Sequence, residues 1–330
     1  MEKQRSLTYT LLKPLFIILL IIYPLLVGLN PYYVRVMFFS LLLANISMAW
    51  SILAVAGQVS FGHAAFFGLA AYVTGLLAVR LGIPPPLSIP VAVLFSTAVV
   101  GGVVAVTFRL REVYFALAML AYAEILKYIV INTPEITGGS LGLLNIPPLG
   151  RIELGSEAID FSKYIPLYYL FLALTFIVAY VMTRIMNSRI GVALKAISRD
   201  ELAAESCGIN VFKYKVIALI VSAIITSSMG AIYAHINRFL YPEVAFSMEW
   251  SIFPIIASLF AGYEISILGP AIGAVILYTV KEFFISRLME RGYEIIYGLL
   301  LVFVLLVLRK GVLDYIIIKV RELRLGKVIT

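Results

Sequence analysis

The chain has 330 residues, of which 62% are hydrophobic and only 13% are charged, and its mean hydropathy is +1.02. No water-soluble core buries this much apolar surface, so the composition excludes a soluble globular protein and predicts an all-α, polytopic membrane protein. The net charge of +8 reflects 26 basic and 18 acidic residues. We interpret it as basic residues retained on the cytoplasmic side of a membrane, not as a nucleic-acid-binding surface.

A helix needs about 20 apolar residues to cross a hydrocarbon core of roughly 30 Å. The sequence predicts about ten such spans, within a range of 8–10: 12–30, 34–55, 63–81, 87–108, 113–131, 165–183, 214–236, 251–263, 266–283 and 294–308. Two places predict discontinuous helices. The eighth span is too short to cross alone, and the second and third meet without a charged loop between them. We expect a single transmembrane domain over residues 1–330.

Sidedness follows from the basic residues. The first residues, MEKQRSLTYTLLKP, are not followed by a small-residue cleavage site, so we expect a retained first span. Placing the N-terminus inside puts 17 of the 26 basic residues in cytoplasmic segments, including Arg109 and Arg111. Both termini are then predicted to be cytoplasmic, and residues 132–164 form an extracytoplasmic loop.

Residues 184–215 interrupt the apolar sequence with a basic, polar segment. Ser198 and Glu201 have the Ser-x-x-Glu spacing of a capping box. Gly208 stands where a left-handed residue ends a helix. The predicted helix, 199–207, is too short to be stable alone in water, so it needs a neighbouring surface. Small residues line one face of it: Ala203, Ala204 and Cys207. A solvated loop that carries cytoplasmic positive charge is the alternative.

Enzymatic motifs are scarce. The sequence contains no GxxxxGK[ST] motif, so any coupling to ATP has to come from a partner. Residues 138–142 match GxSxG, but that motif needs a preceding strand, a following helix and a histidine base. A glycine-rich turn explains it better, and a hydrolase that pairs Ser140 or Ser60 with His63 or His235 is the alternative. The single cysteine, Cys207, excludes disulfides and cysteine-based metal clusters.

Polar residues inside predicted spans are costly and are therefore candidates for function. Glu124 lies near the middle of the fifth span, and Lys127 follows three residues later on the same helical face. We predict a buried structural ion pair, with a role in a permeation path or gate as the alternative.

The junction between the second and third spans is the other polar site. Its small and polar residues are Gly57, Gln58, Ser60, Gly62 and His63. Unwound backbone here would offer polar groups to a small zwitterionic solute, as broken helices do in transporters. A later stretch loosely repeats the pattern with Gly262, Ser266, Gly269, Ala271 and Gly273. Ordinary helix packing through small residues is the alternative explanation.

Four ordered runs carry a family resemblance: AGQVSFGHAAFFGLAAY (Ala56 to Tyr72), YFALAMLAYAEILK (Tyr114 to Lys127), TGGSLGL (Thr137 to Leu143) and ALKAISRDELAAESCGINVFKYK (Ala193 to Lys215). Together with YGLLLVFVLLVLRKGV (Tyr297 to Val312), they extend from about residue 40 to the tail. The chain resembles the permease subunit of branched-chain amino acid ABC importers.

The resemblance implies a transport subunit without an ATPase site of its own, located in the cytoplasmic (inner) membrane of a prokaryote. It implies translocation of leucine, isoleucine and valine, or of related small amino acids and amides, by alternating access. No cofactor is expected on this chain, because ATP and Mg²⁺ act through two partner ATPase subunits. The other implied partners are a sister permease, in a heterodimer rather than a homodimer, and an extracytoplasmic solute-binding protein. An ion-coupled secondary amino acid transporter that titrates Glu124 or Glu264 is the alternative.

The resemblance also identifies the segment at 184–215 as the one that carries a coupling helix, which seats in a groove of the ATPase. Importers of this kind carry an EAAxxxG motif there. In this chain Leu202 replaces the leading glutamate, so Glu201 or Glu205 is the expected charged anchor. The expected coupling residues are Ser198, Glu201, Leu202, Ala203, Ala204, Glu205 and Gly208. The expected path residues are Gly57, Gln58, Ser60, Gly62, His63, Glu124 and Gly262, and the loop residues expected to face the binding protein are Thr137, Gly138 and Gly139.

Overall fold

The structure, a computed structural model, describes residues 18–108, 110, 112–154, 157–263, 268–285, 295 and 299. Its long elements are helices: α2 (Pro31–Val55), α3 (His63–Leu81), α4 (Pro85–Thr107), α5 (Glu112–Ile131), α7 (Tyr164–Met186), α10 (Val211–Asn237), α12 (Glu249–Ala261) and α13 (Gly269–Val280). Residues 18–26 are also helical. A π-helical turn, Lys281–Ile285, follows α13.

Seven helices in the described part of the chain are long and apolar enough to cross a membrane. They include 20 residues, Pro242–Ala261, in which the short α11 (Pro242–Ala245) precedes α12. The prediction of a polytopic helical membrane protein is therefore confirmed. The total of about ten spans stays a prediction, because 12–30 is described only from residue 18 and 294–308 lies outside the described residues apart from 295 and 299.

Local signals explain where the helices begin and end. Asn30 caps α2, since its Oδ1 accepts a hydrogen bond from the Tyr32 amide at 3.0 Å, and Pro31 occupies the first helical position. Gly82 ends α3 in the left-handed conformation with φ +65°.

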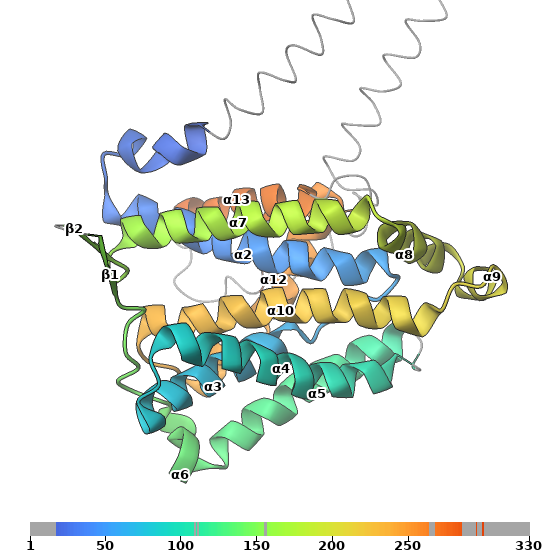
Figure 1. Cartoon of the computed structure of the whole chain (residues 1–330), viewed down its shortest axis with the longest axis horizontal. Coiled ribbons are helices and arrows are strands. Elements are labelled where there is room, and N and C mark those ends of the chain that lie inside the picture. Colours follow the sequence, from blue (N-terminus) through green and yellow to red (C-terminus); the bar gives the residue numbers. More distant parts are fainter. Residues whose placement is uncertain are drawn as a thin grey trace, which may run out of the picture.

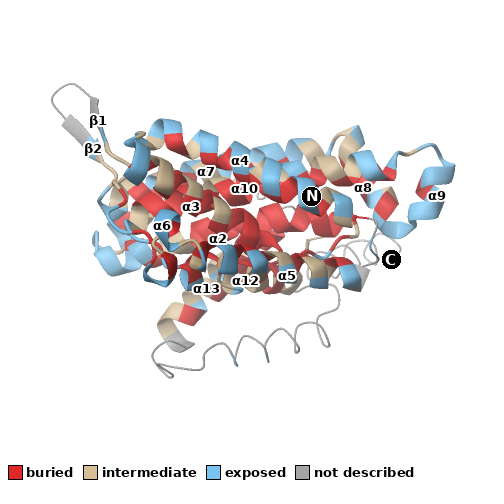
Figure 2. Cartoon of the chain, turned by 90° about the horizontal axis from the view of Figure 1, so that it is seen from below, coloured by how far each residue is buried: buried red, intermediate tan, exposed pale blue. Residues whose placement is uncertain are grey.

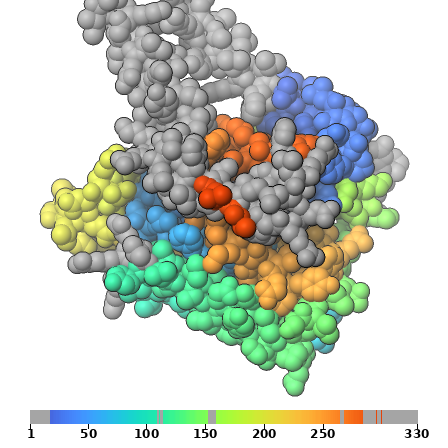
Figure 3. Space-filling view, turned by 180° about the vertical axis from the view of Figure 1, so that it is seen from behind, coloured from blue at the N-terminus to red at the C-terminus, as the bar shows by residue number. Residues whose placement is uncertain are grey.

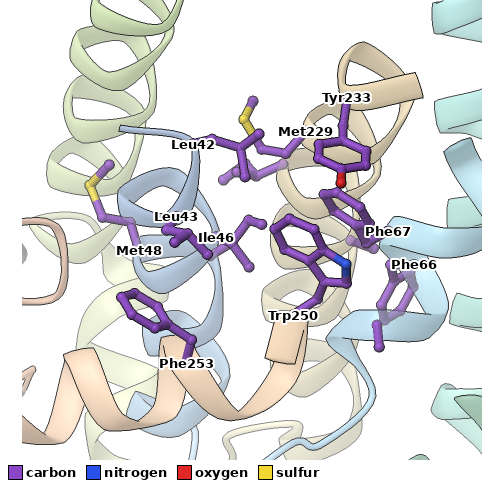
Figure 4. Packing of buried hydrophobic residues seen from close by; sticks show 14 of the residues in the cluster. Leu42, Leu43, Ile46, Met48, Phe66, Phe67, Met229, Tyr233, Trp250 and Phe253 are labelled. Atoms are coloured by element: carbon purple, nitrogen blue, oxygen red, sulfur yellow. The ribbon is translucent and has the colours of Figure 1, made fainter. Parts of the chain in front are cut away.

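Helix α2 lies in the middle of the bundle and packs against α7, α10, α12 and α13 (Figure 1). Buried residues concentrate on α2, α3 and α10, whereas the outer helices expose apolar side chains (Figure 2). Aromatic rings fill the centre, where Trp250 stacks on Phe67 with 4.0 Å between ring centroids and meets the edge of Tyr233 at 5.1 Å (Figure 4). Gly230 allows α10 to approach α3 closely, because a Cβ at this position would meet the Phe67 carbonyl.

The two ends of the bundle differ. At one end, α8 (Arg189–Arg199) and α9 (Glu201–Ser206) project beyond the helices (Figure 1) and form a protrusion, yellow in the space-filling view (Figure 3). The opposite end carries the short α6 (Pro134–Thr137) and a hairpin. The segments at 184–215 and 132–164 thus lie at opposite ends, as the predicted sidedness requires.

The hairpin pairs β1 (Arg151–Leu154) with β2 (Glu157–Asp160) in antiparallel register, from Arg151 opposite Asp160 to Leu154 opposite Glu157. It is an exception to the all-α prediction. RIEL and EAID alternate apolar and charged residues, a pattern that favours strands, but each run is too short to stand out beside the long apolar spans.

Candidate functional site

The segment at 184–215 folds as two helices instead of one. Ser188 caps α8 by accepting a hydrogen bond from the Ile190 amide at 3.1 Å. Asp200 has extended backbone and caps α9, because its Oδ1 accepts from the Ala203 amide at 3.0 Å. The predicted capping box is therefore wrong: Ser198 lies inside α8, and α9 begins at Glu201 instead of Arg199. Aspartate caps as well as serine does, and Asp200 stands where the backbone turns between the two helices.

The predicted end of α9 is confirmed. Gly208 has φ +81°, its amide donates to the Glu205 carbonyl at 2.8 Å, and the Ile209 amide donates to the Ala204 carbonyl at 3.1 Å. These two bonds are those of a Schellman motif, which satisfies the last carbonyls of a helix. Behind the motif, Ala204 packs in a small buried cluster with Ile197 and Val211. The short helix is therefore stabilised by packing against α8 and α10 of the same chain.

The exposed face of α9 holds the residues that remain available to a partner. Ala204 is buried, whereas Ala203 and Glu205 are exposed and Leu202 is 76% exposed. The side chain of Glu201 is tied to Lys215, with 2.5 Å between Oε1 and Nζ, and the Lys215 side chain is only 4% exposed. Glu201 thus holds α9 against the start of α10, whereas the Glu205 side chain stays exposed.

The predicted interruption between the second and third spans is confirmed as an irregular stretch, residues 56–62, which we call the break. Gly57 has φ +78°, a conformation that favours glycine. The backbone of Gly57 faces α8, since a Cβ built on it lies 3.4 Å from the Ser198 Cα. Trp50 Nε1 donates to the Ser60 carbonyl at 2.9 Å, and Ser60 Oγ accepts from the Gly62 amide at 3.2 Å.

The polar side chains at the break are buried, whereas Val59 is exposed. Gln58, Ser60 and His63 are at most 2% exposed. His63 Nε2 shares a hydrogen bond with Ser222 Oγ of α10 at 3.0 Å, while Nδ1 is buried and has no well-formed hydrogen bond among the described residues. Gln58 Oε1 has no hydrogen-bond partner among the described residues. Such an unpaired buried acceptor is rare in a stable interior.

Two serines complete this site and were not predicted from the sequence. Ser222 binds His63, and Ser251 Oγ of α12 accepts a hydrogen bond from the Ala64 amide at 2.9 Å. Ser222 lies in an apolar helical run, whereas Ser251 lies near the start of α12, two residues after Glu249. The only signal for either was that a hydroxyl in a membrane helix needs a partner.

The second predicted interruption is also present. Gly262 has φ +93° and ends α12, and Gly269 begins α13. Residues 264–267, among them Glu264 and Ser266, lie outside the described residues. Tyr263 packs edge-on against Trp50, with 5.8 Å between ring centroids, so the second interruption adjoins the break. Close backbone packing also uses these glycines, since a Cβ on Gly273 would meet the Ala257 carbonyl.

The predicted Glu124–Lys127 ion pair is confirmed, with 2.6 Å between Oε2 and Nζ. It is only partly buried, because the Glu124 side chain is 36% exposed. Glu243 of α11 approaches Lys127 to 3.6 Å and extends the pair into a cluster that was not predicted. The cluster ties α5 to α11, so Glu124 is not among the polar groups that the structure gathers at the break.

At the opposite end, the predicted loop residues form a tight turn. Thr137 Oγ1 donates to the Val130 carbonyl at 2.6 Å, and Gly138 has φ +81°. Ser140 is exposed on a single 3-10 turn, Gly139–Leu141, which confirms the glycine-rich turn and lacks the strand and helix of a nucleophile elbow. His63 bonds to Ser222, and His235 bonds to Thr74 at 2.9 Å and to the Pro147 carbonyl at 2.7 Å, so neither histidine pairs with Ser140.

One carboxylate of the hairpin shows a clear electrostatic effect. The Ser162 amide donates to Asp160 Oδ1 at 2.9 Å, and this hydrogen bond lowers the pKa of Asp160, with Arg151 contributing at 3.3 Å. The Arg151 side chain is 71% exposed, so the pair contributes little to stability.

Comparison with known proteins places these features in one family. Residues 32–305 match the family described as branched-chain amino acid transport system, permease component. Two similar proteins are both named high-affinity branched-chain amino acid transport system permease protein LivM, from Escherichia coli (strain K12) and Salmonella typhimurium (strain LT2). Each is 28% identical in an alignment of 249 residues that covers 70% of this chain and 58% of the relative.

The chain thus spans a little over half the length of the curated relatives it matches. No solved structure matches it. The family match includes the break, α8, α9 and the second interruption. The chain therefore belongs to the family of permease components of branched-chain amino acid transport systems.

Proposed function

We propose that the chain is the permease subunit of an ATP-driven importer that moves branched-chain amino acids, or related small amino acids and amides, across the cytoplasmic membrane of a prokaryote. The observation that carries this proposal is the position of α9, a capped, exposed helix held at one end of an apolar bundle beside a buried polar break. The names of the two relatives, permease proteins of branched-chain amino acid transport systems, support the same substrate class.

The energy source lies outside the chain in this proposal. The sequence has no GxxxxGK[ST] motif, and two partner ATPase subunits supply the ATP and Mg²⁺ chemistry. Helix α9 provides the contact through Leu202, Ala203 and Glu205, which are exposed. The position of α9 in that contact is set by four residues at its ends and its packed face: Ser198, Glu201, Ala204 and Gly208. A sister permease completes the membrane pair.

The solute path in this proposal passes the break. Gly57, Ser60 and Gly62 interrupt the helix, and the polar side chains gathered there would meet a zwitterionic solute, as at the broken helices of other transporters. Gln58 Oε1 is a buried acceptor without a described partner and suits the ammonium group of an amino acid. The turn at Thr137–Gly139, at the opposite end, faces the solute-binding protein.

Copurification tests the proposal. The complex is solubilised gently from its native membrane, captured through this chain, and analysed by mass spectrometry. We expect ATPase subunits with a phosphate-binding loop and a second permease. Recovery of the chain alone, with leucine uptake that survives in ATP-free vesicles and collapses with the ion gradient, would instead identify a secondary transporter.

A further inference from the structure

We propose that the break is a gate and that it moves as one body with α8. The inference rests on the proposed function, because the displacing force comes from ATPase subunits docked on α9. It adds the point at which that displacement enters the membrane part of the chain, namely the contact between Ser198 and Gly57.

The contact joins backbone to backbone. A Cβ built on Gly57 lies 3.4 Å from the Ser198 Cα and 4.0 Å from its Cβ, so no side chain separates α8 from the break. A long side chain between two elements can change its rotamer and absorb a displacement, whereas the space between Gly57 and Ser198 would hold only an added methyl group in ordinary contact. Ser198 is also in the last turn of α8, just before the cap of α9. A displacement of α9 is therefore transmitted to Gly57 with nearly its full amplitude.

The other end of the break is attached to the same segment by a second route. Lys215, in the first turns of α10, binds Glu201 of α9 at 2.5 Å. Ser222 follows on α10 about two turns later and binds His63, the first residue of α3, at 3.0 Å. The break is thus held by α8 where it begins and by α10 where it ends.

The conformation of the break is that of a closed gate. Gln58 and Ser60 are at most 2% exposed, and the Trp50 indole holds the Ser60 carbonyl. At its other end the break meets α5, where a Cβ built on Gly62 would lie 3.1 Å from the Met119 Cβ. If the gate moves with α8, this contact with α5 has to slide.

Two disulfides test whether the break moves with α8 and slides against α5. Both are made in a Cys207→Ser parent, which removes the only native cysteine. Gly57→Cys with Ser198→Cys places the Cβ atoms about 4.0 Å apart, within the range of a disulfide. Gly62→Cys with Met119→Cys is the second pair and links the break to α5; its Cβ atoms would lie 3.1 Å apart, so the disulfide forms once the two elements move apart by a few tenths of an ångström. The readout is ATP-dependent uptake of radiolabelled leucine by the complex in proteoliposomes, before oxidation, after oxidation and after reduction.

We expect the disulfide between the break and α8 to leave at least about half of the uptake, and the disulfide between the break and α5 to lower uptake about tenfold until it is reduced, within the range typical of coupled sites. A block by the first disulfide, or full uptake with the second, overturns the proposal. If cysteine at the left-handed position of Gly57 prevents folding, the effect of the disulfide between the break and α5 on uptake tests the proposal without the other pair. Absence of ATP-dependent uptake in the unmodified complex contradicts the proposed function instead, so the two failures are distinguishable.

Discussion

At the scale of single residues, Gln58 is the clearest sign of function. A buried acceptor without a partner costs about 1–3 kcal/mol, and the Gln58 side chain pays that cost in the described structure. An ammonium group of a solute would satisfy it. We therefore expect Gln58→Leu to raise the KM for leucine about tenfold or more, the loss typical of one hydrogen bond to a charged group, without lowering the stability of the complex.

Thr97 of α4 supplies a matched control for this prediction. Its Oγ1 is also buried without a partner, but Thr97 is not part of the break. Thr97→Val removes that oxygen at nearly constant shape and should leave the KM unchanged, with a melting temperature equal to or above that of the wild type. Uptake kinetics and thermal melting of the complex in detergent measure both quantities. An unaltered KM in Gln58→Leu would count against a solute contact at the break.

At the scale of elements, α9 shows how far the sequence determines a short helix. Gly208 was predicted correctly as its end, because a left-handed glycine after a polar helix has few other uses. The start was wrong, because Ser198 and Asp200 are both good caps and six helical residues carry too little periodicity to choose between them. Asp200 is the cap because α8 continues to Arg199, held by its buried residues Leu194 and Ile197, so Ser198 lies inside a helix.

The true cap makes a testable difference. Asp200→Ala removes the acceptor of the Ala203 amide and should destabilise α9 by about 1 kcal/mol, a large loss for a helix of this length. We expect more ATP hydrolysed for each leucine transported, with normal insertion of the chain. Asp200→Asn keeps a capping oxygen and should stay close to the wild-type ratio. An unchanged ratio in Asp200→Ala would mean that α9 is ordered by its partner alone.

At the scale of the whole molecule, composition and hydropathy predicted the membrane-spanning helices and their interruptions, but few of the tertiary contacts between them. The spans and the two interruptions followed from runs of apolar residues and from glycine spacing. The partners of the polar residues did not follow, since Ser222 meets His63 and Glu243 meets Lys127 only through tertiary packing. Residues far apart in the sequence become neighbours through helix packing that no local pattern encodes.

Sidedness is the whole-molecule property that remains a prediction, and two positions test it. Cys207 is the only cysteine and is exposed beside α9, and Ser140 is exposed at the opposite end of the bundle. Only one candidate span, α7, lies between them in the sequence, so they must face opposite sides of the membrane. Because basic residues concentrate at 184–215, we expect Cys207 on the cytoplasmic side.

A membrane-impermeant maleimide reports the side directly. It should label Cys207 in inside-out vesicles and not in right-side-out vesicles. A Ser140→Cys variant in a Cys207→Ser background should show the reverse pattern. If each position is labelled in the opposite type of vesicle, α9 lies on the side that a cytoplasmic ATPase cannot reach. That result would contradict both the proposed coupling and the proposed gate. Labelling of both positions from the same side would show instead that α7 does not cross the membrane.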